Sequence, residues 1–112
     1  MVNVAELRII ALSFPEVTEE PHFEKTSFRV KKKIFATFDF AKKRACLKLT
    51  LIEQEVFSLI NKQVIYAVPN KWGKQGWTLF ELEKIDMEVF SDALQRAYCN
   101  VAPEKLVKLL TN

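Results

Sequence analysis

The side chains best suited to chemistry in this sequence are cations, and they are concentrated in the middle of the chain. Residues 25–77 hold twelve Lys or Arg against three acids, which gives this span a formal charge of +9. The flanking segments are acidic, −4 over residues 1–24 and −2 over residues 78–112, so the whole chain carries only +3. Charge segregated in this way creates a local field that attracts anions. The sequence therefore favours an anionic partner.

The cations form two short runs, a set of single residues between them, and a loop rich in Trp and Gly. Lysine and arginine contact phosphates, and an exposed Trp can stack on bases or enter a groove. The alternative is that these lysines are ordinary solvated turn residues that also guard sheet edges against aggregation. The candidate contacts to an anionic partner are Arg29, Lys31, Lys32, Lys33, Lys42, Lys43, Arg44, Lys48, Lys71, Trp72 and Lys74.

Other reactive residue types do not form a convincing constellation. His22, the only histidine, is a weak metal ligand among flexible acids, and a surface histidine is the simpler interpretation. Cys46 and Cys99 are too far apart for a metal knuckle or a disulfide framework, and no serine lies in a nucleophile motif. The spacing of Gly73 and Gly76 matches neither a Walker loop nor a dinucleotide fingerprint. We expect no enzymatic activity, no metal and no cofactor.

The elements that must position the cations can be read from periodicity. An amphipathic helix is expected over residues 3–13, followed by an acidic connector over 15–24. Three strands of a meander are expected over 26–30, 34–40 and 44–50, with the lysine-rich turns between them. Thr50 and Glu53 form a capping box that opens a helix of about ten residues. Strands over 64–68 and 77–82, a helix over 86–100 and a last short helix after Pro103 complete the chain.

These elements predict one α+β domain over residues 1–112, in the order α-β-β-β-α-β-β-α-α. It has two layers, a five-stranded antiparallel sheet and helices on one of its faces. Alternation places Ile34, Ala36, Phe38 and Phe40 on the apolar face and Phe35 on the opposite one. The helix that follows Thr50 has its apolar residues at Ile52, Val56, Leu59 and Ile60. Trp77 is expected in the core, whereas the exposure of Trp72 stays open.

The sequence also bears on location. The N-terminal residues lack a small-residue cleavage site after an apolar run, and no apolar stretch approaches the roughly 20 residues of a membrane span. Two isolated cysteines suit a reducing compartment. We expect a cytoplasmic protein that does not enter the membrane.

Several of these stretches together resemble the MmcQ/YjbR-like family of small bacterial proteins. They are Phe14-Pro15-Glu16-Val17, Ser27-Phe28-Arg29-Val30, Lys33-Ile34-Phe35-Ala36, Leu47-Lys48-Leu49 and Gly73-Lys74-Gln75-Gly76-Trp77. The resemblance covers about residues 5–110. It implies a fold similar to secretion chaperones and a role in DNA binding through basic wing-like β elements. By position it marks Arg29, Lys33, Lys48, Lys74 and Trp77 as recurring basic and aromatic places.

Taken together, the charge pattern and the resemblance predict a small DNA-binding protein. Contacts should be made mainly to the phosphate backbone, because the last long helix carries acids and suits the major groove poorly. Double-stranded DNA is the expected partner. Two alternatives stay open. One is a protein-binding, chaperone-like module that holds a peptide or a second copy of itself. The other is a small-molecule binder with a pocket near Trp72, Trp77 and Tyr66.

Overall fold

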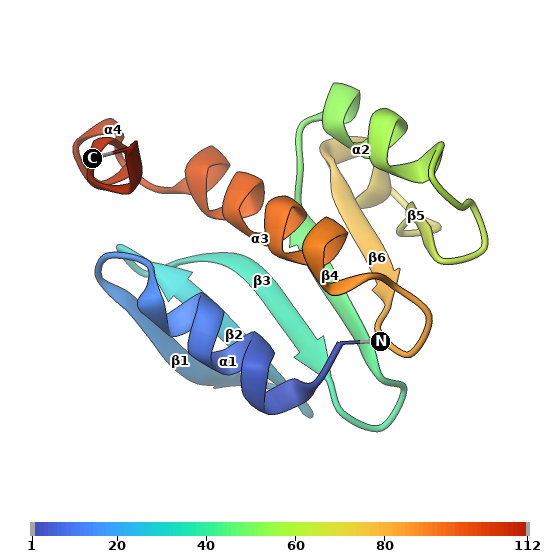
Figure 1. Ribbon diagram of the computed structural model, residues 1–112, viewed down its shortest axis with the longest axis horizontal. Coiled ribbons are helices and arrows are strands. Elements are labelled where there is room, and N and C mark those ends of the chain that lie inside the picture. Colours follow the sequence, from blue (N-terminus) through green and yellow to red (C-terminus); the bar gives the residue numbers. More distant parts are fainter. Residues whose placement is uncertain (1, 112) are drawn as a thin grey trace.

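The computed structural model describes residues 2–111, which build a layer of helices on a six-stranded antiparallel sheet (Figure 1). The elements in chain order are α1 (Val4–Ser13), β1 (Val17–His22), β2 (Lys25–Val30), β3 (Lys33–Asp39), β4 (Arg44–Lys48), α2 (Leu51–Ser58), β5 (Ile65–Ala67), the 3-10 turn η1 (Gly73–Gln75), β6 (Trp77–Glu81), α3 (Met87–Val101), α4 (Glu104–Val107) and the 3-10 turn η2 (Lys108–Thr111). The expected α+β class is confirmed.

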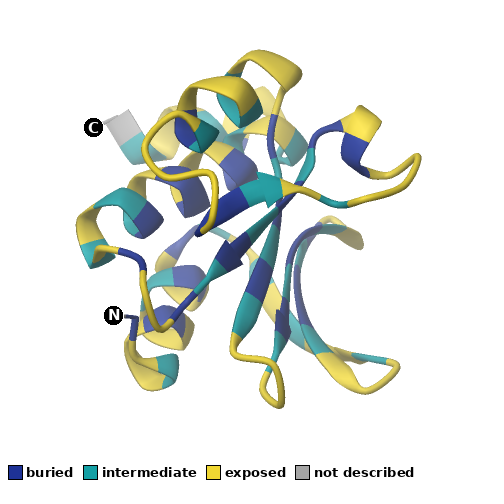
Figure 2. Cartoon of the chain, turned by 90° about the vertical axis from the view of Figure 1, so that its right-hand side faces the viewer, coloured by how far each residue is buried: buried dark blue, intermediate teal, exposed yellow. Residues whose placement is uncertain are grey.

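The sheet has the strand order β1-β2-β3-β4-β6-β5, and every neighbouring pair is antiparallel. The helices α1, α2 and α3 all lie on the same side of the sheet, as Figures 1 and 2 show from two directions. No helix among residues 2–111 lies on the other face. We call it the helix-free face, and its central strand β4 lies between β3 and β6.

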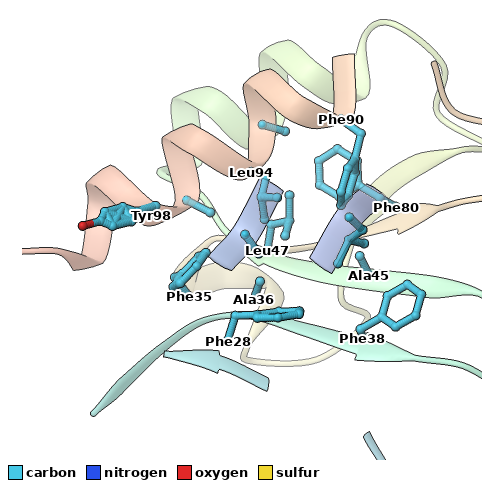
Figure 3. Close-up of a cluster of buried hydrophobic side chains, with 14 of the residues drawn as sticks. Phe28, Phe35, Ala36, Phe38, Ala45, Leu47, Phe80, Phe90, Leu94 and Tyr98 are labelled. Carbon is cyan, nitrogen blue, oxygen red and sulfur yellow. The ribbon is translucent and has the colours of Figure 1, made fainter. Parts of the chain in front are cut away.

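The core is the layer between α3 and the middle of the sheet. Phe90, Leu94 and Tyr98 recur at a spacing of four residues along α3 and are fully buried against side chains of β3, β4 and β6 (Figure 3). The Tyr98 hydroxyl donates a hydrogen bond of 2.8 Å to the carbonyl oxygen of Pro15. A buried tyrosine needs such a partner, so this bond also joins α3 to the segment after α1.

The first difference from the sequence prediction is the additional strand β1, in the segment expected to be an acidic connector. Residues Val17–His22 pair with β2 from Val17↔Val30 to His22↔Lys25. The strand was missed because its acids and Pro21 do not resemble a strand pattern. It lies at the edge of the sheet, where a proline is tolerated and charged side chains reach solvent.

The second difference concerns which face Ile34 and Phe35 occupy. A register shift between Phe28 and Arg29 makes Arg29 pair with Ile34, whereas Phe28 pairs with Ala36. Phe35 is therefore fully buried against Phe14 and Tyr98, and Ile34 turns toward the helix-free face. A bulge of this kind reverses the strict alternation on which the prediction relied. Phe40, also expected on the apolar face, is half exposed.

The sequence predicted α2 and its cap but not its orientation. Its capping box is present as predicted, since the Thr50 hydroxyl accepts from the Glu53 amide and the Glu53 carboxylate accepts from the Thr50 amide. The helix and its following turn expose all four of the apolar residues noted in the sequence, Ile52, Val56, Leu59 and Ile60. The helix is attached by Phe57, which is buried, and by the polar side chain of Gln54.

Candidate nucleic-acid interface

A groove of about 640 Å³ lies on the helix-free face. Its floor consists of residues that point away from the core, among them Thr37, Cys46 and Leu79, which pair across β3, β4 and β6. Aromatic side chains stand at its ends, with Phe23 at the tip of the β1–β2 hairpin and Trp72 and Trp77 around η1. The charged residues in its lining are Lys25, Asp39, Lys42 and Arg44.

The aromatic side chains differ in exposure. Phe23 is 94% exposed, Trp72 is 49% exposed, and Trp77 is half-buried at the start of β6. Trp77 was expected in the core, but its register with Lys48 places it on the helix-free face instead. Its ring lies 5.7 Å from the Lys48 ammonium, and the Lys71 ammonium lies 5.6 Å from the ring of Trp72. Cations close to exposed rings form a surface that can bind both phosphates and bases.

The loop that carries Trp72 is held by close packing on backbone and by hydrogen bonds from two side chains to its carbonyl oxygens. A Cβ on Gly73 would be 1.9 Å from the Val68 carbonyl oxygen, so only glycine fits there. The amide of Gln54 in α2 donates to the carbonyl oxygens of Gly73 and Trp77 at 3.0 and 3.3 Å. The Lys48 ammonium donates to the Gln75 carbonyl oxygen from the β4 side. The loop therefore has a fixed position next to the groove.

Carboxylates from outside the basic span are paired with some of the predicted cations. Lys31 Nζ lies 2.7 Å from Glu16 Oε1, Lys43 Nζ lies 3.5 Å from Glu83 Oε1, and Arg44 Nε lies 3.2 Å from Glu81 Oε2. Within the part of the chain that the structure describes, the other predicted cations have no carboxylate partner. The positive span is thus partly neutralised by the acidic segments that flank it in sequence.

Arg29 has a local role. Its guanidinium donates to the Ser27 hydroxyl at 2.9 Å and to the Pro21 carbonyl oxygen at 3.3 Å, so it ties β2 to the edge strand β1. The Ser27 hydroxyl in turn donates to the Glu20 carbonyl oxygen at 2.9 Å. The Arg29 guanidinium therefore makes its hydrogen bonds within the β1–β2 hairpin. Its charge still contributes to the electrostatic field of the helix-free face.

Two titratable groups on this face have altered acidity. Burial raises the pKa of the Cys46 thiol to about 11, and the Lys25 ammonium lowers it only in part. The pKa of Tyr66 is also raised, first by burial and then by the Glu81 carboxylate, to which the Tyr66 hydroxyl donates a hydrogen bond. A thiol with such a high pKa is a poor nucleophile at neutral pH, so Cys46 forms part of the groove floor rather than a reactive site.

The structure brings some predicted site residues together and separates others. Lys42, Arg44 and Trp72 line the groove, with Lys48 and Lys71 against its tryptophans. Lys71 and Lys74 also line a second hollow beside α2. The Lys31–Lys33 turn lies at the opposite end of β3 from the Lys42–Lys43 turn.

The residues missed were Phe23, Lys25 and Ile34. Phe23 and Lys25 belong to the hairpin formed by the unpredicted strand β1, and Ile34 lies beside the bulge. The excess of β-branched or aromatic residues that usually marks a strand is absent from 17–22. Only the aromatic-acid-basic sequence Phe23-Glu24-Lys25 at the hairpin tip was available as a signal.

The fold and the groove define a small two-layer α+β protein with helices on one face of its sheet and an aromatic, cationic groove on the other. The chain belongs to the YjbR family, whose model matches residues 12–100. This match confirms the resemblance noted in the sequence.

Among solved structures, the crystal structure of Deinococcus radiodurans protein DR2400, which carries a DUF419 domain, is similar to this chain with a TM-score of 0.81. The two are 23% identical, and the match covers 99% of this chain and 89% of that one, so they share the fold. No curated protein matches this chain. Among residues 2–111, no helix is long and apolar enough to cross a membrane.

Proposed function

We propose that the helix-free face binds nucleic acid and that its groove prefers single-stranded segments. The observation that carries the proposal is that aromatic rings and cations line one groove, on a sheet face that no helix of the described residues covers. Lys25 and Lys42 have no carboxylate partner in the described part of the chain and suit phosphate contacts. Bases that are not paired can stack on aromatic side chains of such a surface, whereas bases inside a duplex cannot.

The conformation of Phe23 supports a binding role for the hairpin tip. Its φ is +59°, in the left-handed region that a bulky side chain rarely occupies. Such a conformation costs about 1–3 kcal/mol and is often found at binding sites. The burial of an apolar side chain gives no compensation here, because Phe23 is almost fully exposed. A ring held out to solvent beside a groove suits stacking on a ligand.

The character of α3 favours a single strand over the double-stranded DNA expected from the sequence. α3 is buried along one side, and its outward residues include Glu88 and Asp92, so it is poorly suited to a major groove. Contacts would therefore come from the sheet face. We expect non-specific affinities of about 10⁻⁴ to 10⁻⁶ M near physiological salt.

Intrinsic fluorescence tests the proposal directly, because the only two tryptophans of the chain, Trp72 and Trp77, both line the groove. The full chain is titrated at low salt with a thymidine oligonucleotide and with a duplex of equal length. We expect quenching and a lower Kd for the single strand. The double variant Lys25→Glu/Lys42→Glu should weaken both interactions strongly.

Two controls make the result specific. Lys105→Glu changes an exposed lysine of α4 outside the groove and should alter the Kd much less than either groove substitution. Trp72→Ala should weaken single-strand binding by about tenfold, the effect of losing about 1–3 kcal/mol of base stacking, and should leave duplex binding nearly unchanged. Absence of binding at low salt, or equal losses from Lys105→Glu and the groove variants, would refute the proposal.

A further inference from the structure

Asp39 is the one carboxylate that lines the groove, within the described residues 2–111. It ends β3, where it lies opposite Arg44 of β4. The Arg44 guanidinium contacts Glu81 instead, on its other side, and the same Glu81 oxygen accepts a hydrogen bond from the Tyr66 hydroxyl. Asp39 therefore has no ion-pair partner in the part of the chain that the structure describes. Because a carboxylate repels phosphates, it does not suit the backbone contacts proposed for the neighbouring lysines.

Only part of the hydrogen-bonding capacity of this carboxylate is used within the protein. Asp39 Oδ1 accepts a hydrogen bond of 3.1 Å from the Lys42 amide, which closes the β3–β4 turn. An ionised carboxylate offers about four acceptor sites on its two oxygens. The turn thus fixes the position of the side chain beside the groove and leaves most of its acceptor sites for the donors of a ligand.

The residues around Asp39 can contact each part of one nucleotide. The β1–β2 hairpin tip and the β3–β4 turn lie at the same end of the sheet, because β2 and β3 are antiparallel neighbours. Phe23, Lys25 and Lys42 line the groove at this end, as the carboxylate does. The exposed Phe23 ring suits stacking on a base, the two ammonium groups suit phosphates, and the carboxylate suits the hydrogen-bonding edge of the base.

We propose that Asp39 makes the groove select guanine among the unpaired bases of DNA, an inference that rests on the proposed single-strand binding. The Watson–Crick edge of guanine presents its ring N1–H and its 2-amino group side by side, so both can donate to one carboxylate. Adenine and cytosine present one amino group beside a ring nitrogen that accepts, and thymine presents one N–H between two carbonyl oxygens. These acceptor atoms would face the negative charge of Asp39, so the other three bases are disfavoured.

A series of bases tests the inference on the wild-type chain. Fluorescence anisotropy at low salt compares labelled thymidine oligonucleotides that differ only in one central residue, which is thymidine, guanosine, inosine or adenosine. Inosine is the informative comparison, because it keeps the N1–H of guanine and lacks its 2-amino group. We expect the Kd of the guanosine oligonucleotide to be about tenfold lower than that of the adenosine one, as one bidentate contact gives, with inosine between them.

Asp39→Asn is the decisive variant, since its amide oxygen can still accept from the Lys42 amide while an amino group replaces the second carboxylate oxygen. It should abolish the guanosine preference without weakening the binding of the all-thymidine oligonucleotide. Glu24→Gln is the matched control. It removes the same charge from the exposed residue next to Phe23, outside the lining of the groove, and should keep the preference. Circular dichroism confirms that both variants are folded.

The outcomes separate this inference from the proposed function. Equal Kd values for the guanosine, inosine and adenosine oligonucleotides, with the all-thymidine one still bound, would overturn the selection of guanine alone. A guanosine preference that survives in Asp39→Asn would overturn the role of Asp39. Failure of all four oligonucleotides to bind would refute the proposed function and this inference with it.

Discussion

Gly76 has a φ of +102°, and a Cβ at this position would lie 1.8 Å from the carbonyl oxygen of Leu49. Both observations exclude other residues, the first through backbone strain and the second through a clash with backbone that cannot rotate away. The Leu49 amide donates to the Gly76 carbonyl oxygen at 3.0 Å, so the close approach is part of how β6 begins beside β4. The glycine spacing in this loop thus serves packing, and the loop's binding chemistry depends on its tryptophan and lysines.

Replacing Gly76 by alanine should therefore destabilise the protein by about 2 kcal/mol or more. Urea unfolding followed by circular dichroism measures the change. Lys74→Ala in the same loop is the control and should change stability by less than about 0.5 kcal/mol, since Lys74 is exposed. Equal stabilities of the glycine and alanine proteins would contradict the geometric argument.

At the scale of elements, the β2–β3 turn combines charge with an unfavourable backbone. Lys31 and Lys32 are the two residues of this hairpin loop, and both have positive φ, 51° and 69°. Two-residue loops of this type favour Asn and Gly, which reach this region at little cost. Lysines in these places are more easily explained by their charge than by the turn.

Lys32→Gly should consequently stabilise the fold by about 0.5–1 kcal/mol, because it relieves the left-handed backbone. Lys33→Gly is its control. Lys33 is the first residue of β3 and has no positive φ, so glycine there should be destabilising. Chemical denaturation of the three proteins decides the matter, and a loss of stability in Lys32→Gly would show that the turn is not strained.

The junction of α2 and α3 predicts a pH effect. Burial alone would raise the pKa of Glu53, but hydrogen bonds from Thr50 and Asn100 and the charge of Arg96 outweigh it and hold the pKa below its usual value of 4.5. A carboxyl whose pKa is lower when folded contributes stability above its unfolded pKa and loses that contribution as the pH falls through the folded value.

Wild type should thus be more stable than Glu53→Gln at pH 7, and the difference should shrink toward zero below about pH 4. Unfolding free energies at both pH values provide the test. Glu55→Gln, on the exposed side of the same helix, is the control variant. A Glu53→Gln difference that stays constant with pH would exclude an ionic contribution from this carboxyl.

The elements with strong internal signals were predictable, and those set by long-range packing were not. Asn3, Thr50 and Asp86 cap α1, α2 and α3 as their sequences indicate. β1 is an edge strand without an apolar alternation, so its sequence alone does not indicate a strand. It becomes a strand by pairing with β2. The helix α2 was predicted with its aliphatic residues, but their spacing does not say which side of the helix faces the sheet, and Phe57 and Gln54 attach it there.

At the scale of the whole molecule, the acidic ends of the chain fold back onto its basic middle. Glu16, Glu81 and Glu83 come from the flanking segments and pair with cations of the central span. These pairings join residues far apart in sequence, so the local charge pattern did not indicate them. The candidate groove was predicted in part for the same reason, since Lys42, Arg44 and Trp72 are local signals, whereas Phe23 and Trp77 reach it through the sheet.

This partial neutralisation limits the salt dependence of single-strand binding. Each phosphate contact contributes about −0.7 to the slope of log K against log salt. Four cations in or beside the groove have no carboxylate partner in the described part of the chain, Lys25, Lys42, Lys48 and Lys71, and they would give about −3. Engagement of all twelve central cations would give about −8. The fluorescence titration repeated over a sodium chloride series measures the slope. A value near zero would argue against phosphate contacts, and a value near −8 would require a surface much larger than the groove.

The position of α3 has a consequence for how the protein is made. The buried residues of α3 cover β3 and β4, and both strands emerge from the ribosome well before α3 does. The strand β4 also lacks one of its neighbours until β6 has been synthesised. During synthesis the aromatic side chains of the meander thus remain without their cover until most of the chain has been translated. Nascent chains stalled before residue 87 should be cut readily by protease, and chains stalled after the whole sequence has left the exit tunnel should resist it.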